Sequence, residues 1–237
     1  MKIDLNCDVG EGLNNEHLLM PLTSSCNIAC GGHAGSVEII DRVMELAIKN
    51  KVKTGAHPSF PDRINFGRKV MGISNNQLQQ SLEEQMQLFK ERAIFHHTQV
   101  HHIKPHGALY NLVVVNREKA EVVCKAIRNV FEKIKIYAPY RSKVEEVAQE
   151  YEIEVVYEAF ADRNYNDDLT LVSRSDPHAV LTDPGAIITH VSGMLNKSKV
   201  KTISGKELMI KAQTFCVHGD NENAIAILKA LHQYLDM

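Results

Sequence analysis

The chain has 237 residues, of which 44% are hydrophobic and 24% charged, and its formal net charge is −2. These values are typical of a globular protein and exclude a disordered, collagen-like or disulfide-scaffold chain. The sequence has no basic block and only 6% aromatic residues, so we expect no nucleic-acid partner.

Membrane insertion and disulfide bonding are also disfavoured by the sequence. No apolar run approaches the roughly 20 residues that a membrane helix needs. The five cysteines include no CxxC pair, which favours reduced thiols. We therefore expect a cytoplasmic protein with no membrane partner. The chain has no linker, repeat or low-complexity tract, so we expect a single domain over residues 1–237.

Short runs rich in β-branched residues alternate with longer helical patterns from one end of the chain to the other, which predicts a βα series. The predicted strands are 3–7, 25–30, 52–57, 99–104, 134–138, 153–158 and 214–218. The predicted helices are 37–50, 76–95, 117–131, 142–151, 184–195 and 223–235. Two helix starts have local support: Ser74 and Gln77 have capping-box spacing, and Asp183 precedes Pro184 at a first helical position.

One stretch interrupts the alternation. Segments 168–173 and 200–210 resemble hairpin material inserted between the sixth and seventh strands. The repeated βα order predicts an α/β fold with a parallel sheet. That sheet is either closed as an irregular (β/α)7-type barrel or open and doubly wound, and we favour the barrel.

Polar residues stand at the carboxyl ends of most predicted strands, where the loops of a parallel βα protein converge on one face. A single histidine or aspartate at such a place is more often a loop or capping residue. Six of the seven predicted strands end this way, however, and this repetition predicts an active site. The residues are Asn6 and Asp8; Asn27, Cys30 and His33; His57; Lys104 and His106; Glu158, Asp162 and Arg163; and His218 and Asp220.

A metal ion is one option for this site, because Asp8, His33 and His57 together form a ligand set suited to a divalent cation. Their spacing is not a known ligand motif. Asp4 points to the same face of the first strand as Asp8, so inside the barrel we expect it to meet a partner such as Lys104 or Arg163, or else to be protonated. The sequence contains no GxxxxGK[ST], GxSxG or post-strand GxGxxG pattern. Because these motifs are absent, we expect hydrolytic or acid–base chemistry on a small polar molecule.

Eight motifs spread over the chain resemble the LamB/YcsF family. They are IDLNCDVGE (3–11), NIACGGHAG (27–35), GAHPSFPD (55–62), FGR (66–68), KPHGALYN (104–111), EAFADRNY (158–165), LVSR (171–174) and CVHGD (216–220). The resemblance implies an irregular β/α barrel similar to that of polysaccharide deacetylases. It also implies one subunit of a bacterial ATP-dependent 5-oxoprolinase, which acts with subunits B and C. That enzyme opens 5-oxoproline to L-glutamate while ATP, with Mg²⁺, becomes ADP and phosphate.

If the chain is such a subunit, general acid–base catalysis falls to Asp8 or Asp220 together with His33, His57, His106 or His218. Either Arg163 or Lys104 would bind the lactam carboxylate, because both are cations. Nucleotide-binding parts would come from the partner subunits or from an anion site at residues 218–220, near the start of the last predicted helix. The remaining candidates for substrate binding are Asn6, Asn27, Glu158 and Asp162.

Two other functions remain open from the sequence. A standalone metal-dependent deacetylase or amidohydrolase would use Asp8, His33 and His57 as ligands and would need no ATP. A non-catalytic lactam-binding subunit would bind ligand only. The clustered ionisable residues favour an enzyme over a binding protein.

Overall fold

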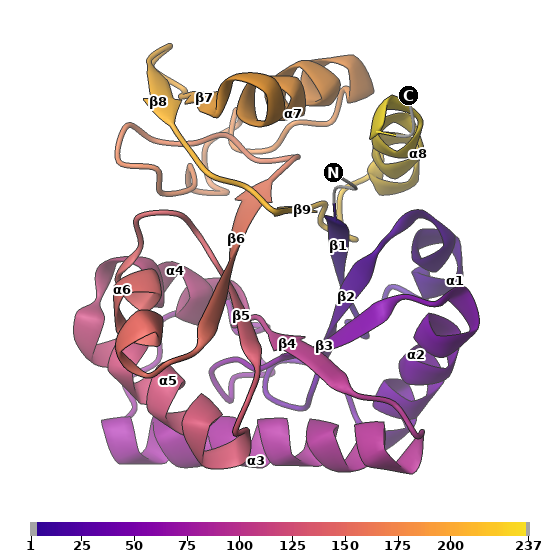
Figure 1. Cartoon of the computed structure of the whole chain (residues 1–237), viewed down its shortest axis with the longest axis vertical. Coiled ribbons are helices and arrows are strands. Elements are labelled where there is room, and N and C mark those ends of the chain that lie inside the picture. The colour runs from indigo at the N-terminus through magenta and orange to yellow at the C-terminus, as the bar shows by residue number, and fades with distance from the viewer. Residues whose placement is uncertain (1–3, 236–237) are drawn as a thin grey trace.

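The structure, a computed structural model, describes residues 4–235 and contains a closed barrel of parallel strands (Figure 1). The last barrel strand pairs with both the sixth and the first, and this pairing closes the barrel. The predicted barrel is therefore confirmed and the open sheet is excluded. Around the barrel the strands are β1 (Asp4–Val9), β2 (Ser25–Ala29), β3 (Lys53–His57), β4 (Val100–Ile103), β5 (Lys135–Ala138), β6 (Glu154–Phe160) and β9 (Thr214–Cys216).

Helices surround the barrel, and all six predicted helices are present. They are α2 (Val37–Asn50), α3 (Asn75–Phe95), α5 (Arg117–Val130), α6 (Lys143–Glu150), α7 (Pro184–Lys197) and α8 (Ala224–Leu235). Both predicted caps are confirmed: Ser74 and Gln77 form a capping box before α3, and Asp183 accepts a hydrogen bond from the Ala186 N–H at the start of α7.

Two helices were not predicted. One is the short α1 (Glu16–Leu19), which a 3₁₀ turn (Met20–Leu22) continues. The other is α4 (Gly107–Val115), whose sequence GALYNLVVV is almost entirely apolar. An apolar run of this length has no clear polar face, so its periodicity does not distinguish a helix from a strand. The omission of α4 matters because this helix begins directly after His106.

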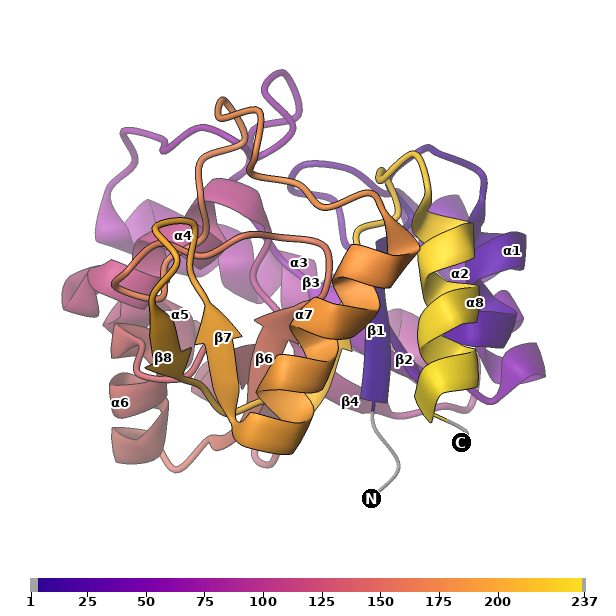
Figure 2. The same cartoon turned by 90° about the horizontal axis from the view of Figure 1, so that it is seen from above.

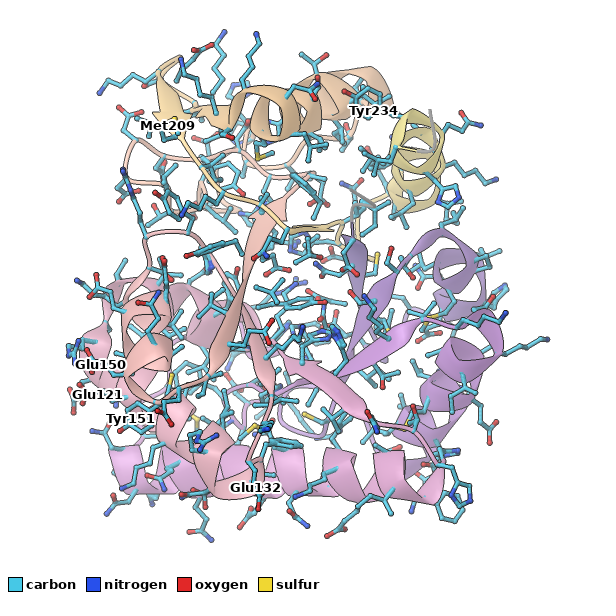
Figure 3. The ribbon with its side chains drawn as sticks, viewed as in Figure 1. Glu121, Glu132, Glu150, Tyr151, Met209 and Tyr234 are labelled. Atoms are coloured by element: carbon cyan, nitrogen blue, oxygen red, sulfur yellow. The ribbon has the colours of Figure 1, made fainter. Side chains whose placement is uncertain are left out.

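The insertion before the last strand contains an antiparallel hairpin of β7 (Lys199–Lys201) and β8 (Glu207–Met209), which confirms the hairpin predicted over 200–210. The other predicted hairpin segment, 168–173, forms no strand; it lies in a loop that turns back on itself, with an antiparallel bridge between Tyr165 and Leu171. The hairpin and α7 lie on one side of the barrel (Figure 1), and Met209 ends β8 where the chain turns back toward the barrel (Figure 3). On α8, Tyr234 accepts a hydrogen bond from Asn196 of α7.

The loops at the carboxyl ends of the strands gather at one end of the barrel, and the loops after β3 and β6 extend furthest from it (Figure 2). No helix within residues 4–235 is both long and apolar enough to cross a bilayer. All five cysteines are buried free thiols, as predicted.

The barrel interior is polar at the amino-terminal end. Asp4 accepts hydrogen bonds from Ser25 Oγ at 2.6 Å and Thr214 Oγ1 at 2.7 Å, and Lys53 Nζ lies 3.6 Å away. Asp4 therefore meets a cationic partner as expected, but that partner is Lys53 and not Lys104 or Arg163. Asp4 stands at the start of β1, and the strand carries Asp8 four residues further toward the opposite end.

The middle of the barrel contains a buried amide and imidazole network. Asn27 donates to Asn6 Oδ1 at 2.8 Å, and its own Oδ1 lies 2.6 Å from His102 Nε2. The His102 ring stacks on Tyr137 and lies across Gly55, where a Cβ atom would come within 2.3 Å of the ring. The absence of a side chain at Gly55 therefore makes room for this imidazole.

Candidate functional site

A cavity of about 290 Å³ opens at the carboxyl ends of the barrel strands. Its wall combines residues that follow β1, β3, β4, β6 and β9, so it forms where the sequence pattern predicted the site. The predicted residues that line it are Asp8, His57, Lys104, His106, Arg163, His218 and Asp220. Further lining side chains that the sequence did not single out include Glu11, Arg68, Tyr110, Phe160 and Arg174.

Lys104 is the buried cation of this site. Its Nζ lies 2.9 Å from Asp8 Oδ1, 2.9 Å from Glu158 Oε1 and 3.1 Å from Cys216 Sγ. Although burial opposes the charge, the nearby Asp8 and Glu158 carboxylates hold the pKa of Lys104 well above its usual value. The ammonium group is thus engaged by protein groups, which argues against a primary role in binding a substrate carboxylate.

Asp8 connects Lys104 to a cluster of imidazoles. Its Oδ1 accepts hydrogen bonds from Lys104 and Asn27, and its Oδ2 lies 3.4 Å from His57 Nε2. Although burial opposes ionisation, His57 and Lys104 hold the pKa of Asp8 well below its usual value. Burial also acts to lower the pKa of His57, but the Asp8 carboxylate raises it overall.

Three imidazoles and one carboxylate meet beside Asp8. Glu11 Oε1 lies 3.0 Å from His33 Nε2 and 3.3 Å from His106 Nδ1, and His57 Nε2 lies 3.0 Å from His106 Nδ1. Burial and the neighbouring His57 lower the pKa of both His33 and His106 to about 2. Burial and the Asp8 charge raise the pKa of Glu11. His33 and His106 are therefore neutral at neutral pH, whereas the raised pKa values of His57 and Glu11 favour the protonated forms of these two groups.

A separate aspartate–histidine pair stands on another part of the wall. Asp162 Oδ1 lies 2.9 Å from His218 Nδ1, and Asp162 Oδ2 accepts from the His218 backbone N–H and from Asn221. Although burial opposes ionisation, His218 holds the pKa of Asp162 below its usual value. The His218 ring also stacks on Phe160. This imidazole is thus fixed in orientation, as a general base requires.

Three arginines and one aspartate give one part of the cavity wall a positive charge. Arg68 and Arg174 both contact the Asp220 carboxylate, at 2.7 and 3.0 Å. Arg163 donates to the backbone carbonyl groups of Val172 and Ala179. Although burial opposes ionisation, Arg174 and its neighbours lower the pKa of Asp220. Because two arginines hold this carboxylate as an ion pair, it is poorly suited to act as a base.

Several predicted site residues lie behind the cavity wall and not on it. His33 is buried behind its partner Glu11, and Asp162 is buried behind its partner His218. Asn6 and Asn27 belong to the buried network in the middle of the barrel. Glu158 accepts hydrogen bonds from Asn6 and Tyr110 and faces a second cavity beside the first. Cys30 is a buried core residue.

Glu11, Arg68 and Arg174 were not predicted as site residues from the sequence, although each stands within one of the quoted motifs. Arg68 and Arg174 lie in long loops far beyond the ends of β3 and β6, so a search at the strand ends does not reach them. Glu11 lies only two residues after β1 and was within reach of that search. The segment 218–220 precedes α8, which begins only at Ala224, and therefore does not form the first turn of that helix.

The chain matches the LamB/YcsF family over residues 3–237. It is 37% identical to the 5-oxoprolinase A subunit of Bacillus cytotoxicus over 238 residues, which cover 98% of this chain and 94% of that protein. It is 35% identical to the 5-oxoprolinase A subunit of Bacillus cereus, with coverage of 99% and 95%. The crystal structure of a lactam utilization protein from Thermus thermophilus is 33% identical and aligns with a TM-score of 0.91 over 99% of this chain and 97% of that chain. The chain belongs to the LamB/YcsF family, as its sequence motifs indicated.

Proposed function

We propose that this chain is the A subunit of an ATP-dependent 5-oxoprolinase, which opens 5-oxo-L-proline to L-glutamate together with subunits B and C. The observation that carries the proposal is the similarity, along nearly the whole chain, to the A subunits of 5-oxoprolinases. The cavity adds support, because about 290 Å³ lies near the lower limit of ligand sites, roughly 300 Å³, and suits a small molecule.

The charge of the cavity fits a ligand with one carboxylate, as 5-oxoproline has. Arg68, Arg163 and Arg174 all line it, and Asp220 offsets the charge of only one of them. Arginine can bind a carboxylate through two parallel N–H groups. We therefore assign carboxylate binding to these arginines and not to Lys104, whose ammonium already contacts Asp8 and Glu158.

Opening the lactam requires water to add to the carbonyl carbon, the C–N bond to break, and the leaving nitrogen to gain a proton. We assign these proton transfers to His218, which would take a proton from the water and return it to the nitrogen. Asp162 would act as a positioning residue, because its carboxylate engages Nδ1 and leaves Nε2 for the exchange.

ATP has a chemical purpose in this reaction. Amide resonance makes the lactam carbonyl a poor electrophile, and transfer of the ATP γ-phosphoryl group to its oxygen, with ADP as the leaving group, would give a much better acceptor for water. After the C–N bond breaks, a second water would release the phosphate and leave the free side-chain carboxylate of glutamate. The chain has no GxxxxGK[ST] phosphate loop. We therefore propose that ATP, with Mg²⁺, acts as a cosubstrate of the assembled complex and that subunits B and C contribute to its binding.

The test is glutamate release from 5-oxoproline by this chain assembled with subunits B and C, with and without ATP·Mg. We expect ATP-dependent release and a loss of kcat of about 10²- to 10⁴-fold for His218→Gln. Asp162→Asn should also lower kcat, with little change in KM. The matched control is His17→Gln, which changes an exposed histidine on α1 outside the cavity and should leave turnover unchanged.

Each alternative function predicts a different result. No release by the intact complex would refute the substrate assignment. Release by this chain alone without ATP would favour the metal-dependent amidohydrolase. Full turnover by His218→Gln, and by variants of the other cavity histidines, would favour a non-catalytic lactam-binding subunit.

A further inference from the structure

Four side chains direct ligand-type atoms at one point in the cavity wall: Glu11 Oε1, His33 Nε2, His57 Nε2 and His106 Nδ1. All four atoms lie within 4.8 Å of one another. The shortest separations are 3.0 Å between Glu11 and His33 and 3.0 Å between His57 and His106, and the Glu11–His57 separation is 3.9 Å.

The hydrogen bonds on the far sides of two rings fix their tautomers. His57 Nδ1 lies 2.7 Å from the Lys104 carbonyl oxygen, and His106 Nε2 lies 3.0 Å from the Phe66 carbonyl oxygen. A carbonyl oxygen only accepts, so each of these nitrogens carries the hydrogen. When both rings are neutral, His57 Nε2 and His106 Nδ1 are two lone-pair nitrogens 3.0 Å apart, so either a second proton on His57 or a metal ion must lie between them.

We propose that Glu11, His33, His57 and His106 bind one divalent transition-metal ion, with zinc as the best fit. In a tetrahedral site with bonds of about 2.1 Å, the ligand atoms lie about 3.4 Å apart. The separations of 3.0, 3.3 and 3.9 Å lie on both sides of that value. Three imidazoles with one carboxylate suit zinc and related metals, whereas Mg²⁺ and Ca²⁺ prefer oxygen ligands.

Two further observations favour a metal ion over protons. Metal-binding histidines usually donate their second ring N–H to a carbonyl or carboxylate, as His57 and His106 do to carbonyl oxygens. In addition, the rings of His33 and His106 stack face to face with centroids 3.6 Å apart. Two imidazolium cations would repel each other at this separation. His33 lacks the second-nitrogen contact that His57 and His106 make, because its Nδ1 is buried and has no hydrogen-bond partner within residues 4–235.

The structure also favours this cluster over the neighbouring one formed by Asp8, Cys216 and His218. There the Lys104 ammonium lies 2.9 Å from Asp8 and 3.1 Å from Cys216, so a cation already occupies that place. Asp8 was expected from the sequence to be a ligand together with His33 and His57. Its Oδ1 instead binds Lys104 and Asn27, and Glu11 takes the carboxylate position.

A metal ion at this place would adjoin the cavity, because Glu11, His57 and His106 all line it. It would supply a Lewis acid to whatever small molecule binds there. The proposal concerns the same cavity as the proposed function but rests on geometry alone, so metal binding and lactam turnover can be tested separately.

The test is metal binding by the full chain, purified without a histidine tag and freed of metal with a chelator. We expect one equivalent of Zn²⁺ in isothermal titration calorimetry, and visible Co²⁺ bands of the intensity that tetrahedral coordination gives. Glu11→Gln and His106→Gln should each weaken the affinity by at least about tenfold. Glu11→Gln keeps the size of the side chain, and circular dichroism would confirm that each variant folds.

His218→Gln is the matched control, because it removes a ligand-type atom from the neighbouring cluster alone. It should bind Zn²⁺ as the unchanged chain does. The proposal is refuted if the unchanged chain binds no stoichiometric metal. It is also refuted if His218→Gln abolishes binding while Glu11→Gln retains it, since the ion would then lie with Asp8 and Cys216. A failure of the assembled complex to release glutamate would bear on the proposed function only and would leave the result on metal binding unchanged.

Discussion

Replacing Lys104 by methionine tests whether the buried ammonium holds the barrel interior together. Lys104 is 2% exposed, and its Nζ lies 2.9 Å from carboxylate oxygens of both Asp8 and Glu158. Methionine roughly preserves the length of the side chain but leaves both carboxylates without a cation. Breaking a buried ion pair from one side costs about 3 to 5 kcal/mol. At roughly 2 to 4 °C per kcal/mol for a chain of this size, Tm should fall by about 6 to 20 °C.

The assay is urea unfolding followed by circular dichroism, with Glu158→Gln as the second member of a double-mutant cycle. The double variant leaves only one carboxylate unpaired. It should therefore be more stable than the sum of the two single losses predicts, by about 1 to 3 kcal/mol. If Lys104→Met lost less than about 1 kcal/mol at an unchanged urea m-value, the ammonium would not be compensating these charges.

Two further predictions concern stability away from the cavity. Asp41 on α2 accepts two hydrogen bonds from Arg92 on α3, and although burial opposes ionisation, Arg92 lowers the pKa of Asp41. A lowered pKa in the folded state stabilises at neutral pH, and this contribution is lost as the pH falls through that pKa. Asp41→Asn should therefore cost about 0.5 to 1 kcal/mol at pH 7 and almost nothing in strong acid, as urea midpoints would report; a cost independent of pH would contradict this. Gly55→Ala should lower stability by about 1 to 3 kcal/mol, because its Cβ would lie 2.3 Å from the His102 ring. Gly72→Ala, where a Cβ meets nothing within 4 Å, is the control, and equal thermal midpoints for the two variants would refute the steric argument.

The strands and their order were predictable because short candidate strands alternate with longer helical patterns along the chain, and each connection contains a helix. The polar ends of the strands were predictable for the same reason, since parallel strands place those ends on one face. His57, Lys104 and His218 all reach the cavity as expected. Helix α4 was missed because its apolar sequence has no polar face to mark its period.

Contacts within the site were less predictable than positions, because they join residues far apart in the sequence. Asp162 contacts His218, 56 residues away, and nothing in the sequence pattern indicated this pair. Asp220 pairs with Arg68 and Arg174 from two different loops, and neither partner was predicted. Which partner a charged side chain meets depends on loop conformation, and a strand pattern carries no information about that.

Charge balance connects the stability of the barrel with the proposed metal ion. Asp8, Glu11 and Glu158 carry three negative charges around one ammonium, that of Lys104, so the group sums to −3 + 1 = −2. One proton on His57 would leave −1, whereas a divalent ion at Glu11 would bring the sum to zero. Uncompensated charge is costly in a buried site. The Lys104 ammonium would thus compensate the charges of the deeper carboxylates, Asp8 and Glu158, and the metal ion would compensate that of Glu11 at the cavity wall.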